Sequence, residues 1–381
     1  MERQAVGEAA AVGQRAIEAL SQRPELVAVV VVLIAVAVLI GVVFGRHFGR
    51  TAGDRLAAAL ADRDRVVGLM HPNPDPDAMA SAMGVAEIAE AVGTSAVIQH
   101  PGRIRHSENR AFETVLECEF DRIERMAELE TEAVVLVDHN EPRGFEGAEY
   151  VHPYAVVDHH PGNGEGLAFT DIRPGRGSCA SIVTEYLQDR GWSVDHDAGG
   201  KTVTPTLATG LLYGIQSDTT AFTRGCTPAE FDAAAYLFPA ADSDSLDRIA
   251  NPQVDGETLD VKALAITERE TEGSFLVSHV GELSNLDALA TAAEELIRLE
   301  GVSAAVVTGE HDGTLHLSGR SRDDRVHMGK ALMAAVEPLP DSSAGGHARM
   351  GGGQAALPAA TDGGTPADLE SRLFAAMNGT L

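Results

Sequence analysis

The stretch LMHPNPDPDAMAS, residues 69–81, connects the end of an apolar run to the start of a helical pattern. Two carboxylates, Asp75 and Asp77, lie two positions apart in a proline-rich turn, and His71 precedes the first by four residues. The two aspartates could simply shape a Pro/Asx turn. One imidazole and two carboxylates at the end of a strand are also a set of metal ligands. The stretch therefore predicts a strand, a turn and a helix, and it raises the question of what the turn binds.

Outside this stretch, apolar runs of strand length alternate with segments of helix length. This alternation predicts an α/β domain with a parallel sheet that is covered on both faces. In such a sheet the ligand site lies at the carboxyl ends of the strands. The expected strands are residues 65–70, 95–100, 133–138 and 154–160, and the expected helices are residues 77–92, 108–117, 178–190 and 204–217.

Three further segments place acids and histidines at the ends of expected elements: VDHN, VDHH and GIQSDT supply Asp138, then Asp158, His159 and His160, then Asp218. Taken singly, Asp138 could cap a helix, the two histidines could be core residues, and Asp218 could end a helix. Together with the first turn, four segments bring Asp and His to one edge of one sheet. This ligand set suits Mn²⁺ or Mg²⁺ better than structural zinc, and two metals that share a carboxylate would offset the repulsion between the acids.

The second half of the chain begins with an acidic helical segment that we interpret as an inter-domain connector. Beyond it, the pattern predicts a smaller α/β domain with a strand at 274–281, a helix at 286–299, a hairpin at 303–321 with its turn at 311–313, and helices at 327–336 and 366–377. The predicted organisation is an N-terminal tail (1–25), a transmembrane helix (26–45), a juxtamembrane linker helix (46–64), a first domain (65–226), the connector (227–256) and a second domain (257–381).

The transmembrane expectation rests on LVAVVVVLIAVAVLIGVVF, residues 26–44, which is apolar for about one bilayer crossing. The arginines that follow it place the bulk of the chain in the cytoplasm by the positive-inside bias. A cleaved signal peptide is the alternative, but the apolar run is long, begins late and is not directly followed by an A-x-A site. We expect a single-pass protein of the cell membrane whose folded domains are cytoplasmic.

The net charge of −28, from 29 basic and 57 acidic residues, is extreme, and the lysines are Lys201, Lys262 and Lys330 alone. Such a composition is typical of halophilic proteins, in which salt screens the self-repulsion; an ordinary acidic cytosolic protein is the alternative. The charge argues against binding to long duplex DNA, which needs a basic face. Three cysteines without a CxxC pair argue against a disulfide framework or a zinc knuckle.

Four motifs in order, HPNPDPDA, VDHN, VDHH and GIQSDT, resemble those of the DHH phosphoesterase superfamily, which is named for the triplet at residues 158–160. The segment GGHARMGG (345–352), preceded by SGRSR (318–322), resembles the glycine-rich signature of the associated DHHA1 domain. One departure is that Ala344 stands where the signature has its first glycine, which an alanine can fill if its φ is negative.

The resemblance implies two bound divalent ions, Mn²⁺ first, with Mg²⁺ and Co²⁺ as alternatives. It assigns His71 and Asp75 to the first ion, places Asp138 between the two ions, and assigns to the second Asp77, His159 and Asp218.

The resemblance also implies the other site residues. His160 would contact a substrate phosphate and Asp158 would orient a histidine, so that Asp138, His160 and Asp158 form the catalytic set. In the second domain, the residues expected to bind a substrate phosphate or terminal nucleotide are Arg320, Gly345, Gly346 and His347.

The expected function is hydrolysis, by a metal-activated water, of a phosphodiester in short oligoribonucleotides or cyclic di-AMP, or of the 3′-phosphate of 3′-phosphoadenosine 5′-phosphate (pAp). The alternative is a membrane-tethered nucleotide-binding regulator, for example of ion transport, with little or no catalysis. All six metal positions carry competent ligands, which favours the enzyme. The expected partners are a small nucleotide and the membrane, and a homodimer is a further expectation.

Overall fold

The computed structural model describes residues 50–356, apart from 196, 198 and 324, and residues 366–381. These residues form two compact units: the first contains the chain up to residue 104 and residues 112–247, and the second contains residues 105–111 and 248–381. The predicted transmembrane helix at 26–45 lies outside the described residues and stays a prediction. Within the described part of the chain, no helix is both long and apolar enough to span a bilayer.

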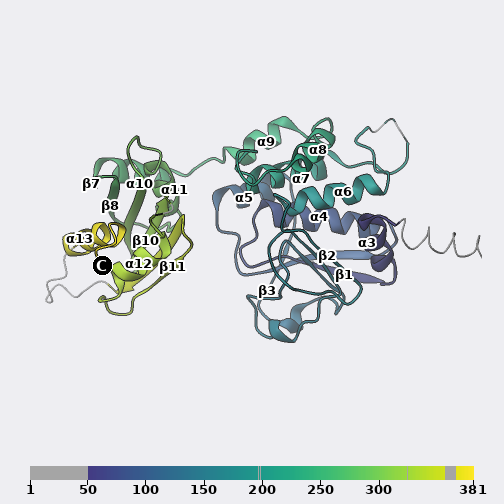
Figure 1. The fold of residues 1–381 in the computed structure, drawn as a ribbon, viewed down its shortest axis with the longest axis horizontal. Helices are drawn as coiled ribbons and strands as arrows, with labels where there is room; N and C mark the ends of the chain where they lie inside the picture. The colour runs from purple at the N-terminus through teal and green to yellow at the C-terminus, as the bar shows by residue number, and fades with distance from the viewer. Residues whose placement is uncertain (1–49, 196, 198, 324, 357–365) are drawn as a thin grey trace, which may run out of the picture. The chain divides into compact units, whose positions relative to one another are not determined.

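The first unit is built on a six-stranded sheet in the order β3-β2-β1-β4-β5-β6 (Figure 1). All neighbouring strands are parallel, which confirms the predicted parallel sheet. The buried runs of β1, β4 and β5 are the continuous apolar stretches that such a sheet requires. The strands are β1 (Arg65–Leu69), β2 (Ser95–Pro101), β3 (Asp121–Ile123), β4 (Val134–Val137), β5 (Ala155–Asp158) and β6 (Phe169–Ile172).

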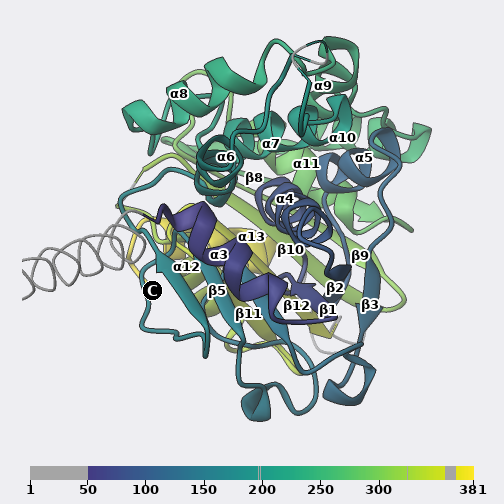
Figure 2. The same ribbon diagram turned by 90° about the vertical axis from the view of Figure 1, so that its right-hand side faces the viewer.

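One face of this sheet is covered by helices: α4 packs against α6 and α7, and α3 lies beside α6 (Figures 1 and 2). The other face carries no long helix in the described chain, contrary to the expected helical cover. There Leu129, Phe145 and Val151, from loops and short 3₁₀ turns, pack on the strands. The remaining elements before residue 251 are α3 (Ala52–Ala61), α4 (Pro76–Glu90), α5 (Ser107–Val115), α6 (Cys179–Asp189), α7 (Pro205–Asp218), α8 (Pro228–Leu237), α9 (Ser243–Ala250), η1 (Met126–Glu128) and η2 (Ala148–Tyr150).

The strand order reverses between β1 and β4, each of which begins a series of strands running outward in opposite directions. In an open parallel sheet, ligands bind at the carboxyl ends of the strands beside such a switch point. Three of the four predicted motifs lie at the carboxyl ends of the neighbouring strands β1, β4 and β5, beside this switch point. The fourth lies at the C-terminal end of α7.

The second unit contains a mixed sheet in the order β11-β12-β10-β9-β8-β7, in which only β8 and β9 pair in parallel. Helices α10 and α11 pack on one face, and α12 and α13 pack on the other. The predicted hairpin is present, with β9 and β10 joined at residues 312–313. The elements are α10 (Gly256–Thr267), β7 (Arg269–Glu272), β8 (Phe275–Glu282), α11 (Asp287–Leu296), β9 (Ala304–His311), β10 (Thr314–Ser321), α12 (Met328–Val336), β11 (Ser343–Gly346), β12 (Met350–Ala356) and α13 (Pro366–Met377).

Candidate metal centre

The structure gathers the six predicted metal ligands into two groups at the switch point of the first sheet. Within each group, one ligand atom per residue lies within 4.8 Å of the others. We call His71, Asp75 and Asp138 the first cluster, and Asp77, His159 and Asp218 the second cluster.

Asp138 faces both clusters. Its Oδ2 lies 3.5 Å from His71 Nε2, and its Oδ1 lies 3.3 Å from His159 Nε2. The side chain is 1% exposed, and the backbone has a left-handed φ of 63°, a conformation that costs a non-glycine residue about 1 kcal/mol or more. This turn at the end of β4 aims one carboxylate at two sites, which is the position that the resemblance assigns to a bridging ligand.

The first cluster is open to solvent on one side. His71 Nδ1 lies 3.0 Å from the carbonyl oxygen of Pro72, so that Nε2 faces the acids, 3.6 Å from Asp75 Oδ2. Asp75 caps α4 by accepting a hydrogen bond from the amide of Ala78 at 3.0 Å, and its side chain is 38% exposed. A single carboxylate therefore both begins the helix and faces the cluster.

The second cluster is less exposed than the first, and the backbone holds two of its residues, Asp77 and His159. The two carboxylate oxygens of Asp77 accept hydrogen bonds of 2.7 Å from the amides of Cys179 and Ala180, which are the first residues of α6. His159 Nδ1 lies 3.2 Å from the carbonyl oxygen of Arg176. Its Nε2 is thereby directed at the acids, 3.2 Å from Asp218 Oδ2 and 3.7 Å from Asp77 Oδ2.

The electrostatics of the clusters favour bound cations. Burial alone would lower the pKa of His71, but hydrogen bonds to Asp138 and Asp75 raise it to about 11; in the same way, Asp138 and Asp218 raise the pKa of His159 to about 12. Burial raises the pKa of Asp77 well above its usual value, and the nearby Asp138 and Asp218 raise it further. Without metal, these acids are neutralised by protons on the histidines, and a divalent ion would replace those protons.

Two buried polar atoms test whether the clusters fit metal ions. Asp138 Oδ1 and His159 Nε2 are both inaccessible, and although they lie 3.3 Å apart, their geometry gives neither atom a hydrogen-bond partner among the described residues. Leaving such an atom unsatisfied costs about 1–3 kcal/mol, more for a charged group. Asp and His donors suit hard and borderline divalent ions. The two clusters therefore fit two such ions, with the first cluster holding one, the second cluster holding the other, and Asp138 reaching both.

The triplet that follows β5 is completed by a buried aspartate. Asp158 is fully buried, and its Oδ1 accepts from the amide of His160 at 3.0 Å and lies 2.9 Å from His160 Nδ1. Asn140 donates through its side-chain amide to the other oxygen of Asp158. The His160 ring is half exposed, and its hydrogen bond to the Asp158 carboxylate raises its pKa. Asp158 thus holds the His160 ring, whereas its catalytic role and the contact of His160 with substrate stay predictions.

The residues expected to bind substrate in the second unit are engaged by neighbours. Arg320, on β10, donates to Glu294 at 2.8 and 3.2 Å and to the carbonyl oxygen of Gly319 at 3.0 Å. Its side chain is 13% exposed. The structure places Arg320 on the sheet but commits its guanidinium to an ion pair, so a substrate phosphate there would have to compete with Glu294.

The glycine-rich stretch forms a hairpin. Gly345 and Gly346 lie in β11 and pair with β12, and the amide of His347 donates across the turn to Met350 at 2.8 Å. Gly346 has a φ of 140°, which requires glycine. Ala344 is absent from the described residues with positive φ, which explains why alanine is tolerated there.

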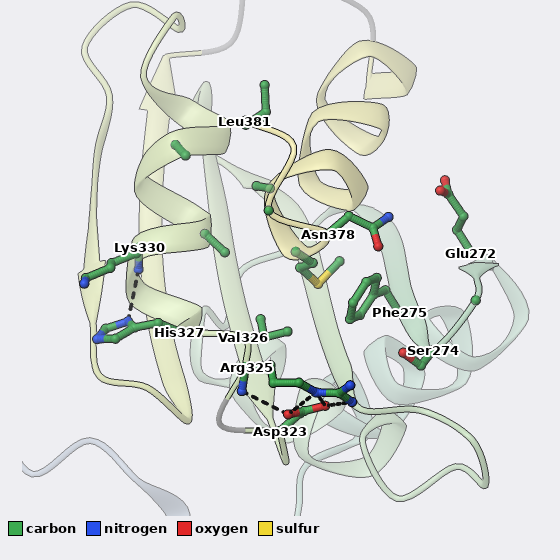
Figure 3. A pocket seen from close by; sticks show the side chains of 16 residues that line it. Glu272, Ser274, Phe275, Asp323, Arg325, Val326, His327, Lys330, Asn378 and Leu381 are labelled. Atoms are coloured by element: carbon green, nitrogen blue, oxygen red, sulfur yellow. Dashed lines mark hydrogen bonds and ion pairs between the residues drawn. The ribbon is translucent and has the colours of Figure 1, made fainter.

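A cavity of about 680 Å³ in the second unit lies between the β7–β8 turn, the start of α12 and the C-terminal residues (Figure 3). None of the four predicted substrate-binding residues lines it. Its Arg325 is paired with Asp323, and the amide of Lys330 donates to His327 Nδ1 at 3.4 Å. The Arg325 guanidinium and one ring nitrogen of His327 are therefore engaged within the protein.

One supporting residue was missed from the sequence. Glu230, on α8, is fully buried and accepts from the amide of Gly177 at 2.9 Å and the hydroxyl of Ser181 at 2.8 Å. It thus fixes the segment that begins at Arg176, whose carbonyl oxygen contacts His159. The available signal was the capping box T-x-x-E at the start of α8, formed by Thr227 and Glu230.

Comparison with protein families gives matches in both units. Residues 65–215 match the N-terminal domain of the DHH family, and residues 272–363 match the DHHA1 domain. The chain therefore contains a DHH domain followed by a DHHA1 domain, which confirms the resemblance seen in its motifs.

The uncharacterized protein MJ1633 of Methanocaldococcus jannaschii is 35% identical over 268 residues, which are 70% of this chain and 54% of that protein. The cyclic-di-AMP phosphodiesterase GdpP of Geobacillus thermodenitrificans is 26% identical over 318 residues, 76% of this chain and 47% of that protein. The chain thus spans about half the length of these two relatives. A probable manganese-dependent inorganic pyrophosphatase of Bacillus cereus is 28% identical over 258 residues, 64% of this chain and 78% of that protein.

Among solved structures, an exopolyphosphatase-related protein from Bacteroides fragilis superposes with a TM-score of 0.63 at 14% identity, covering 86% of this chain and 96% of that one. At this identity the likeness shows the fold. The Asp and His donors of the two clusters are consistent with divalent metals such as Mn²⁺, the ion named for the Bacillus cereus relative.

Proposed function

We propose that this protein hydrolyses phosphodiester bonds, or the 3′-phosphate, of small nucleotides. The observation that carries the proposal is the position of Asp138, which directs one carboxylate oxygen at each of two complete ligand clusters. Two ions held in this way provide an activated water and stabilise the charge that develops on a phosphoryl group.

The chain's own residues supply orientation and a proton donor. Two amides of α6 donate to Asp77, and His159 Nδ1 donates to the carbonyl oxygen of Arg176, so both side chains are fixed before any substrate arrives. Asp158 accepts a hydrogen bond from His160 Nδ1 and raises the pKa of His160, which favours the protonated ring whose Nε2–H would donate to a phosphoryl oxygen. A charge-assisted hydrogen bond of this kind is stronger than one from a neutral donor.

Two features favour small nucleotides over pyrophosphate as substrates. The DHHA1 domain is present, and GdpP, a relative that matches 76% of this chain, is named as a cyclic-di-AMP phosphodiesterase. Short oligoribonucleotides, cyclic di-AMP and pAp all remain within the proposed class. We also propose that residues 26–45 tether the protein to the cell membrane with both units in the cytoplasm.

The test uses the full-length chain, purified with Mn²⁺ in high KCl. Hydrolysis of cyclic di-AMP, the linear dinucleotide pApA, a five-nucleotide RNA, pAp and pyrophosphate is compared for the wild type, for Asp138→Asn, and for Asp121→Asn as a control. Asp121 is an exposed carboxylate at the start of β3. We expect nucleotide hydrolysis by the wild type and the control but not by Asp138→Asn. Nucleotide binding without hydrolysis by any of the three would contradict the proposal and favour the tethered regulator.

A further inference from the structure

A pocket of about 400 Å³ adjoins the metal centre within the first unit. Its two walls are the loops that follow β4 and β5, and they include Asp158 and His160 of the triplet. The other side chains that matter for its chemistry are Asn140, Glu141 and Arg143. The volume is in the range of pockets that bind small ligands. The clusters occupy one end of this region, which leaves the pocket for a part of the substrate beyond the reacting group.

Glycines set the shape of the wall that follows β5. A Cβ on Gly162 would lie 2.0 Å from Asn140 Oδ1, and a Cβ on Gly164 would lie 1.7 Å from the carbonyl oxygen of Asn140. Any side chain at these positions would displace Asn140, which donates to Asp158. The loop can therefore pack closely against Asn140 only because residues 162 and 164 are glycines.

The wall that follows β4 is fixed in a similar way. Gly144 has a φ of 89°, and a Cβ there would lie 2.1 Å from Pro72 Cγ. The turn just after Arg143 thus packs against the residue that follows the ligand His71. Arg143 is held at the rim of the pocket by backbone packing and not by its own side-chain contacts.

The charge of Arg143 is available to a ligand. Its side chain is exposed and makes no ion pair among the residues that the structure describes, although the chain carries 57 acids. By contrast, Arg173 and Arg176 of the same unit are both paired with Glu185. An arginine without a carboxylate partner in so acidic a protein, on the wall that also holds His160, suits an anionic group.

We propose that Arg143 binds a second, uncleaved phosphate of the substrate while His160 contacts the phosphate that is cleaved. The inference rests on the proposed function and narrows its substrate class to nucleotides with at least two separate phosphate groups, such as pApA, cyclic di-AMP or pAp. A guanidinium can donate two parallel hydrogen bonds to a phosphate, which a lysine cannot. Glu141, on the same wall, is an acceptor for the ribose hydroxyls that accompany such a phosphate.

The test compares two substrates in the full-length chain with Mn²⁺: pApA, which has two phosphates, and bis(p-nitrophenyl) phosphate, which has one. For Arg143→Ala we expect the KM for pApA to rise about 10- to 100-fold, as for loss of a charge-assisted hydrogen bond, with kcat for the single-phosphate substrate unchanged. Arg143→Lys should give an intermediate KM. Arg122→Ala, on the edge strand β3, is the control and should change neither value.

An equal loss of activity on both substrates, or no change on either, would overturn the inference. Thermal unfolding of Arg143→Ala should match the wild type because the side chain is exposed. Calorimetric binding of pApA in Ca²⁺ gives a readout that does not depend on catalysis. If the wild type cleaves neither substrate, the proposed function fails. Binding then decides the role of Arg143: a loss of pApA affinity of about 10-fold or more in Arg143→Ala supports it, and unchanged affinity overturns it.

Discussion

The two metal clusters use the same chemistry in different surroundings. In the first cluster, Asp75 is 38% exposed and is held by one hydrogen bond to the start of its own helix. In the second cluster, Asp77 is fully buried and receives two amides from another helix, while His159 is directed by a backbone carbonyl. The second cluster is therefore fixed by groups that are distant in sequence, whereas the first depends on its local turn.

This difference predicts different affinities. Ligands that are already held in place lose little conformational freedom when an ion binds. Groups that hydrogen-bond to the ligand side chains also raise the affinity for the metal. We therefore expect the second cluster to bind its ion more tightly and the first to exchange its ion more readily. Asp138 belongs to both and should couple them.

The largest effect is expected for Asp138→Asn. Asparagine keeps the shape but removes the charge that both ions share, so activity on the preferred nucleotide should fall by about 10³-fold or more. Steady-state rates with Mn²⁺ would measure this, with Asp121→Asn beside it. A variant that kept more than about a tenth of wild-type activity would show that Asp138 does not join the clusters.

The next effect concerns pH. His71 and His159 have pKa values of about 11 and about 12 in the metal-free chain, so both are protonated at neutral pH and must lose a proton to bind an ion. The apparent affinity of each cluster for Mn²⁺ should therefore rise with pH, by about tenfold per unit for each proton released. Calorimetry in buffers of different ionisation enthalpy would count the protons. Affinity that stays constant between about pH 6 and 8 would contradict this electrostatic description.

A matched pair of substitutions separates the clusters. Asn at position 75 can still cap α4. Asp75→Asn should therefore lower the affinity of the first cluster for its ion by about 10-fold and leave the melting temperature unchanged. In Asp77→Asn, the side-chain NH₂ group would face a backbone amide of Cys179 or Ala180, donor against donor. We expect this variant not to bind the second ion, and we expect its free energy of unfolding to fall by about 1–3 kcal/mol. Equilibrium dialysis and thermal unfolding would test both. Equal losses in the two variants would remove the proposed difference between the clusters.

The smallest effect is expected for Glu230→Gln. The amide would face the amide and hydroxyl of Thr227, which now donate to Glu230, and the segment before α6 should shift. Affinity at the second cluster should fall about 10-fold, with the first cluster unaffected. Asp232→Asn, an exposed change on the same helix, is the control. A change in the first cluster alone would show that Glu230 acts by another route.

Much of the first sheet, and the convergence of the six candidate ligands, could be predicted from the sequence. The strands β1, β4 and β5 are continuous apolar runs, and five of the six residues follow them, whereas Asp218 ends α7. The short strands β3 and β6 were missed because they carry exposed polar residues. The hairpin of β11 and β12 was not predicted because its glycines give no side-chain pattern. Asn140 and Glu230 contact residues 18 to 53 positions away in the sequence; the capping box marks Glu230, but no local pattern shows these contacts.

The central claim, that Asp138 joins two ions, is tested most directly by electron paramagnetic resonance of the full-length chain loaded with two equivalents of Mn²⁺. We predict the spectrum of a magnetically coupled manganese pair in the wild type, and its loss in Asp138→Asn. Two bound ions that gave only the six-line signal of isolated Mn²⁺ in the wild type would contradict the account, because ions that share one carboxylate cannot be magnetically independent.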